Sequence, residues 1–87
     1  MKAVISVLGK DMVGILAKVS MECANANANI SDVTQSILGE YFAMVMIVEI
    51  DKMNCSLEEL KQNIEVAVPG MQVHVMHENI FNSMHRI

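Results

Sequence analysis

The spacing of hydrophobic residues changes several times along the chain, and each change predicts a different element. Residues 3–8 are rich in β-branched side chains and end at Gly9, which predicts a first strand. Apolar residues then recur at helical spacing and predict a helix over 13–27, because the Asn residues that follow favour a helix end. The expected buried stripe of this helix contains Met12, Ile15, Leu16, Val19, Cys23 and Ala26.

Two further strands are predicted in the middle of the chain, over residues 30–38 and 41–50. They are separated by Gly39 and Glu40 alone. A two-residue loop with Gly first is typical of a type II′ turn, so we expect these strands to form an antiparallel hairpin.

The second helix has the clearest start signal of the chain. Ser56 is followed three residues later by Glu59, the spacing of a capping box, and Cys55 and Leu60 stand at the positions of a hydrophobic staple. Pro69 and Gly70 predict its end. The expected buried stripe consists of Leu57, Leu60, Ile64 and Val68.

The order of these elements predicts the fold class. A fourth strand is expected over 71–76, which gives β-α-β-β-α-β, and residues 79–87 form a tail with room for one helical turn. This order is typical of an α+β, ferredoxin-like βαββαβ sandwich, with a four-stranded antiparallel sheet and two helices on one face. We expect one domain over 1–87, with its core at about 3–78.

The strand expected over 41–50 is apolar on both faces. Phe42, Met44, Met46, Val48 and Ile50 alternate with the set Tyr41, Ala43, Val45 and Ile47. A sheet with helices on one side needs only one apolar face, so the second set predicts an interface, most simply that of a twofold homodimer. The alternative is a central strand with tolerated apolar surface residues.

Composition and charge exclude several partners. The net charge of −4 weighs against nucleic acids and anionic membranes, which bind Lys and Arg. Three aromatic residues and no Trp leave little for stacking on bases, so the RNA-recognition motif, which shares this topology, is a weak alternative. The nine Met residues suit irregular cores and adaptable interfaces.

The two cysteines, Cys23 and Cys55, form no disulfide framework, and the N-terminal residues lack a secretory cleavage pattern. The longest apolar run has eight residues, too few to span a bilayer. We therefore expect a cytoplasmic protein. Cys23 falls on a buried stripe, whereas Cys55 lies near a helix start, which lowers a thiol pKa.

The segment from Gly9 to Leu16 joins a strand end, a turn and a helix N-terminus. Backbone N–H groups at a helix start attract carboxylates or phosphates, and Gly14 lets a ligand approach the backbone. The simpler interpretation is a strand-to-helix loop with Asp11 as the helix N-cap.

The residues Lys-Asp-Met-Val-Gly-Ile-Leu-Ala at 10–17 resemble the D-x-P-G-I-L loop that opens ACT domains. Ala-Asn-Ile-Ser-Asp at 28–32 resembles the entry to their second strand, and the resemblance covers nearly the whole chain. The chain is similar to small stand-alone ACT proteins of uncharacterised function. These resemble the ACT modules of the glycine cleavage system transcriptional repressor and of formyltetrahydrofolate deformylase.

The resemblance implies a regulatory module that binds an amino acid at a homodimer interface and acts through a partner protein. Carried over to this chain, Asp11 would hold a ligand amino group and the Asn29 amide would bond either end of the ligand. The N–H groups from Met12 through Val13 and Gly14 to Ile15 would hold a carboxylate. Val13 departs from the family by replacing the usual loop Pro, and Gly9 by replacing a common polar residue.

Other chemistry is weakly supported. His74, His77, Glu78 and His85 do not make a metal set, because alternation along a strand separates positions 74 and 77. We expect no metal, no cofactor and no enzyme activity, since no catalytic set is legible. A catalytic role of the Asp11 loop is a weak alternative. The remaining alternatives are a pure interaction module and a domain that dimerises without a small ligand.

Overall fold

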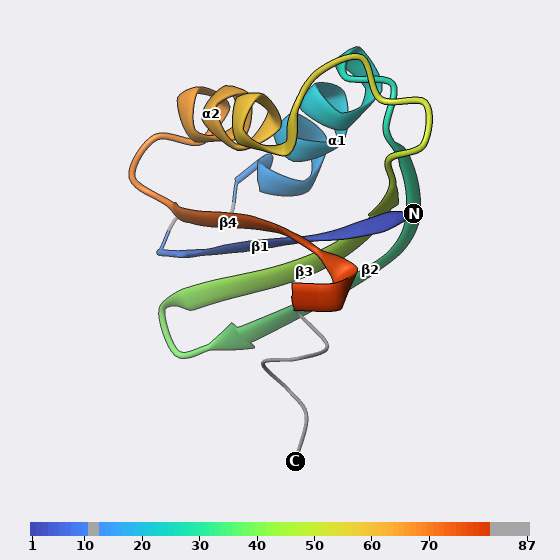
Figure 1. Cartoon of the computed structure of the whole chain (residues 1–87). Helices are drawn as coiled ribbons and strands as arrows, with labels where there is room; N and C mark the ends of the chain where they lie inside the picture. Colours follow the sequence, from blue (N-terminus) through green and yellow to red (C-terminus); the bar gives the residue numbers. More distant parts are fainter. Residues whose placement is uncertain (11–12, 81–87) are drawn as a thin grey trace.

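The computed structural model describes residues 1–10 and 13–80, and its elements follow the predicted order (Figure 1). Each boundary lies within two residues of its expected position. The elements are β1 (Lys2–Gly9), α1 (Ile15–Asn25), β2 (Asn29–Leu38), β3 (Tyr41–Glu49), α2 (Leu57–Ala67) and β4 (Gln72–His77). Residues 78–80 form one helical turn, and the rest of the expected tail lies outside the described residues.

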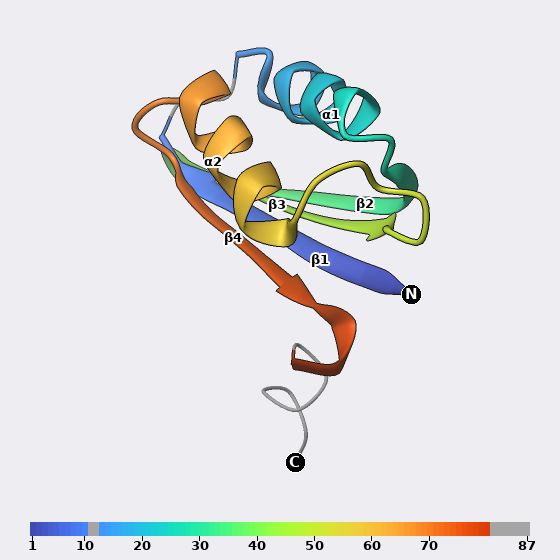
Figure 2. The same cartoon turned by 45° about the horizontal axis from the view of Figure 1, so that its top comes forward.

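The four strands form one sheet in the order β2-β3-β1-β4, and every neighbouring pair is antiparallel. Both helices cover the same face, as the two views agree (Figures 1 and 2). The ferredoxin-like fold class is therefore confirmed. Strand β1 lies inside the sheet, where it pairs with β3 on one side and β4 on the other, while β2 and β4 are the edges.

The core lies between the sheet and the helices. Strand β3 alternates as predicted, since Phe42, Met44, Met46 and Val48 are buried against the helices. Helix α1 contributes Ile15, Val19 and Cys23, and α2 contributes Leu60 and Ile64. The apolar faces of α1, α2 and β3 thus pack together in a single layer.

Helix α2 begins as its sequence predicts. The Ser56 hydroxyl accepts a hydrogen bond from the Glu59 backbone N–H at 3.1 Å. The Ser56 backbone N–H donates in return to Glu59 Oε1 at 3.2 Å, which completes the capping box. Two N–H groups that a helix start leaves unpaired are therefore satisfied within the chain.

Two expectations for α1 are wrong. Its N-cap is Gly14, in the left-handed conformation at φ 71°, and not Asp11. Leu16 is exposed and does not join the stripe, because the sheet-facing side is already filled by residues at 15, 19 and 23. Met12 lies outside the described residues.

The β2–β3 hairpin turns at Gly39 and Glu40, with Leu38 opposite Tyr41. Gly39 has φ 62°, and among the described non-glycine residues only Asn27 has a positive φ. A positive φ at the first turn position and not at the second agrees with the predicted type II′ turn. Among the described residues, no helix is long and apolar enough to cross a membrane.

Candidate functional site

The residues expected to bind a ligand after β1 fall into three groups. Asp11 and Met12 lie outside the described residues. Val13 and Gly14 are exposed immediately before α1, and Val13 keeps 80% of its surface. Ile15 is buried in the core, so only its backbone is left to face a ligand. The described part of the loop therefore offers backbone groups and an exposed apolar side chain.

Asn29 lies at the opposite end of the sheet from this loop. It is paired with Glu49 at the start of β2, and Glu49 is paired with Lys2 at the start of β1. Gly9, which leads to the loop, is seven residues along β1, roughly 23 Å away at 3.3 Å per residue. One chain therefore does not bring Asn29 together with the Gly14 region.

Asn29 lines a polar hollow of about 310 Å³ with Asn27, Glu49, Asp51 and Lys52. The Asn27 side-chain amide donates to the Lys52 carbonyl at 2.8 Å, which ties the end of α1 to the segment after β3. The carboxylates of Glu49 and Asp51 and the amide of Asn29 give this hollow hydrogen-bonding groups of both kinds. It can accept from an ammonium group as well as donate to a carboxylate.

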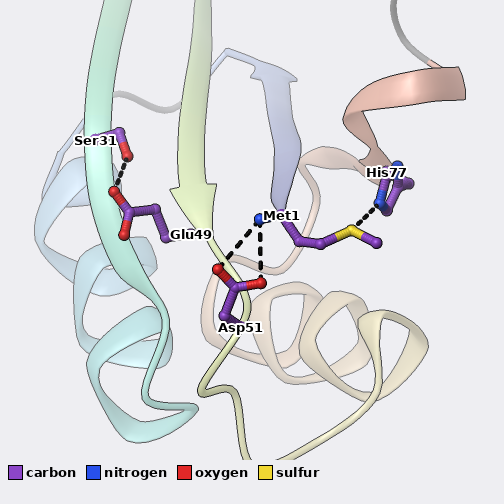
Figure 3. A network of polar contacts seen from close by, with 5 residues as sticks. All are labelled: Met1, Ser31, Glu49, Asp51 and His77. Atoms are coloured by element: carbon purple, nitrogen blue, oxygen red, sulfur yellow. Dashed lines mark hydrogen bonds and ion pairs between the residues drawn. The ribbon is translucent and has the colours of Figure 1, made fainter.

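The same end of the sheet carries a set of polar contacts (Figure 3). The Ser31 hydroxyl donates to Glu49 Oε2 at 3.3 Å, and the Met1 ammonium lies 3.1 Å from Asp51 Oδ1. The Asn79 backbone N–H donates to His77 Nδ1 at 3.1 Å, and His77 Nε2 lies 2.8 Å from the Met1 thioether sulfur. The contacts from Ser31 and the Met1 ammonium hold the two carboxylates of the hollow, Glu49 and Asp51, in place.

A second hollow, of about 410 Å³, opens at the Gly9 end of the sheet. Lys10 and Tyr41 both line it, and Lys10 Nζ lies 5.6 Å from the centre of the Tyr41 ring. Lys10 also forms an ion pair with Glu40 at 3.2 Å. Sequence reasoning missed Lys10 as a site residue, although it directly precedes Asp11 and is the one base of that loop.

The face of the sheet that carries no helix holds the residues predicted as a dimer interface. Tyr41 and Val45 are exposed, whereas Ala43 and Ile47 are half-buried. Leu8 extends this set, because it is paired with Ala43 and is exposed as well. An apolar row that follows β3 on the open face is thus present in the single chain.

The pKa of the Cys55 thiol differs from the expected one. Burial and the neighbouring Glu59 carboxylate raise the pKa of Cys55, so the expected lowering by the helix start is wrong. Burial, with Glu22 as a second cause, raises the pKa of Cys23 to about 11. Both cysteines are free. A thiol with a raised pKa is mostly protonated near neutral pH, so neither is an activated nucleophile.

The two histidines of β4 lie on opposite faces of the strand, as alternation predicts. His74 is paired with Ser6 and His77 with Ala3, so the two side chains leave opposite faces of β4, and His85 lies outside the described residues. Within residues 1–10 and 13–80, no group of three His, Cys, Asp or Glu side chains is placed to hold a metal ion.

A model of the ACT domain family matches residues 2–77. The chain belongs to the ACT domain family. A UPF0237 protein of Methanocaldococcus jannaschii is 44% identical over 88 residues, which cover 99% of this chain and 98% of that relative. ACT domains are regulatory modules, and the match to this chain covers nearly all of that relative.

Solved structures agree with the family. An ACT domain protein from Streptococcus pneumoniae is 34% identical, covers 98% of each chain and superposes with a TM-score of 0.78. A candidate glycine cleavage system transcriptional repressor has a TM-score of 0.67 at 14% identity, and covers 86% of this chain and 46% of its own. The latter shares the fold alone.

Proposed function

We propose that this ACT module senses a small metabolite, an amino acid, at a homodimer interface and transmits its state to a partner protein. The observation that carries the proposal is the separation of the two halves of the expected site. Asn29 and the Gly14 loop lie at opposite ends of one sheet. A site that needs both groups requires two copies of the chain.

Twofold symmetry supplies the missing half. An axis perpendicular to the strands places the Asn29 end of one copy beside the Gly9 end of the other. The loop then offers Asp11 and the backbone N–H groups from Met12 to Ile15, while the partner copy offers the Asn29 amide. An α-amino acid has one ammonium and one carboxylate, which these acceptors and donors match.

The apolar open face supports a dimer. Tyr41, Ala43, Val45 and Ile47 form its central row on β3, and Leu8 adjoins it. Burying this row against a second copy would remove apolar surface from water on both chains. A regulated partner protein is required in addition, because a ligand can act at a distance only through an element that reads the change.

The test is a thermal-shift screen against the common amino acids, beginning with glycine and serine. A ligand at ten times its dissociation constant stabilises the fold by roughly 1.4 kcal/mol. We expect a selective shift that Asp11→Ala and Asn29→Ala abolish. Asp32→Ala and Asn63→Ala, which change exposed residues of the same types elsewhere, are the matched controls.

Mixing the two variants tests whether the site is shared between copies. In a dimer formed from one Asp11→Ala chain and one Asn29→Ala chain, one site keeps both groups and the other loses both. An equimolar mixture should therefore regain about a quarter of the wild-type sites. No recovery would contradict a shared site. No shift with any amino acid would refute the sensor and favour the pure interaction module.

A further inference from the structure

We propose that the hollow at the Gly9 end of the sheet is a second ligand site, which binds a small apolar carboxylic acid through Lys10. The hollow measures about 410 Å³ and is lined by Leu8, Lys10, Tyr41, Pro69 and Gln72, among others. It lies where β1 ends, β3 begins and the chain turns into β4. None of these five residues belongs to the amino-acid site proposed above, although Tyr41 is part of the proposed dimer face and Leu8 adjoins it.

Lys10 is placed to hold a carboxylate, because it already holds one. Its Nζ lies 3.2 Å from Glu40 Oε1, with about two thirds of both side chains exposed. An ion pair between exposed groups contributes at most about 1 kcal/mol, so a ligand carboxylate can replace Glu40 at little cost. Glu40 therefore acts as an internal competitor for the same ammonium group.

The remaining walls select an apolar body for the ligand. Leu8 is 43% exposed and Tyr41 is 47% exposed, although both are large and apolar. Pro69 adds a third apolar surface, and the Gln72 amide adds one polar group that can donate to the second carboxylate oxygen. An anion without an apolar part, such as phosphate, would leave Leu8 and Tyr41 in water.

Tyr41 makes the site measurable without a label. It is the one Tyr of the chain, and the sequence has no Trp, so intrinsic fluorescence reports this residue alone. The probe is 3-methylbutanoate, and its neutral control is 3-methylbutanamide, which has the same carbon skeleton. We expect a saturable fluorescence change with the acid and none with the amide. The side-chain amide resonance of Gln72 should move over the same concentrations.

Two substitutions should move the affinity in opposite directions. Lys10→Met removes the cation and should abolish saturation, whereas Glu40→Gln removes the competitor and should tighten binding by about twofold to fivefold. Lys18→Met, at an exposed position of α1, is the matched control and should leave the titration unchanged. A wild-type response that survives in Lys10→Met would overturn the proposal. So would a response to the amide, or the lack of any response to the acid.

The outcome is separable from that of the amino-acid sensor. Asp11→Asn should remove the amino-acid response while the 3-methylbutanoate titration stays unchanged. If Asp11→Asn abolishes both, the hollow is not an independent site and the present proposal fails. If the amino-acid screen is negative and the Lys10-dependent titration remains, the sensor proposal fails and the hollow is still a ligand site.

Discussion

The open face of the sheet leads to a quantitative prediction about Val45→Glu. Val45 is 37% exposed in the middle of the apolar row on β3, so it is a position that a second copy would cover. A glutamate in that row would place a charge in the interface of each copy. We therefore expect Val45→Glu to abolish the dimer while the single chain stays folded, because its side chain can reach water.

The magnitude follows from the size of the chain. When a dimer unfolds to two chains, a tenfold increase in concentration adds about 1.4 kcal/mol per dimer. At about 2.1 cal/mol/K per residue, two chains of 87 residues gain roughly 370 cal/mol/K on unfolding. The melting temperature Tm should thus rise by about 4 °C for each tenfold increase in concentration.

The assay is Tm by circular dichroism over a hundredfold range of concentration, with light scattering for the molar mass. Wild type should shift by about 8 °C over that range, and Val45→Glu should not shift. Gln62→Glu adds the same charge on the exposed side of α2 and should behave as wild type. A wild-type Tm that does not depend on concentration, or a Val45→Glu variant that still dimerises, would refute the interface.

Three other predictions concern α2 and the thiols. Ser56→Ala should lower the free energy of unfolding in urea by about 1 kcal/mol, because it removes the acceptor of the Glu59 N–H bond. Ser36→Ala, at an exposed position of β2, should lower it little, and equal effects would contradict the capping box. In native protein Cys23 should resist iodoacetamide, and Cys55 should react faster as pH rises and faster still in Glu59→Gln, as read by mass spectrometry. Because folding raises the pKa of Cys23 from 9.0 to about 11, its contribution to stability is complete below pH 9 and should be lost as pH rises from 9 to 11, where only the unfolded chain loses the proton.

The features that sequence predicted well depend on local rules. The capping box at Ser56 and Glu59 needs residues only three apart, and the alternation of β3 needs only a period of two. The same locality explains the error at Cys55. The helix start was expected to lower the pKa of Cys55, but partial burial raises it, and the Glu59 carboxylate that caps the helix acts in the same direction. A rule about the charge at helix ends does not include the charge of the side chain that caps the helix.

Lys10 shows why part of the site could not be predicted. Its partners Glu40 and Tyr41 are thirty residues away in sequence, and they meet it because β1 and β3 are paired from Lys2↔Glu49 to Gly9↔Phe42. That register is a property of the assembled sheet. The hollow beside Lys10 likewise depends on the turn at Pro69 and Gly70, which follows α2 and lines the hollow from the other half of the chain.

The separation of Asn29 from the Gly14 loop, in contrast, was already implied by the order of the elements. Strands β1 and β2 are both antiparallel to β3, so they run in the same direction, as two strands joined by a helical crossover do. The end of the first and the start of the second must then lie at opposite ends of the sheet. A small molecule is too short to reach from one end of the sheet to the other. A ligand that contacts both segments therefore requires a second chain. For this module, dimerisation is consequently a condition of the proposed sensing and not an addition to it.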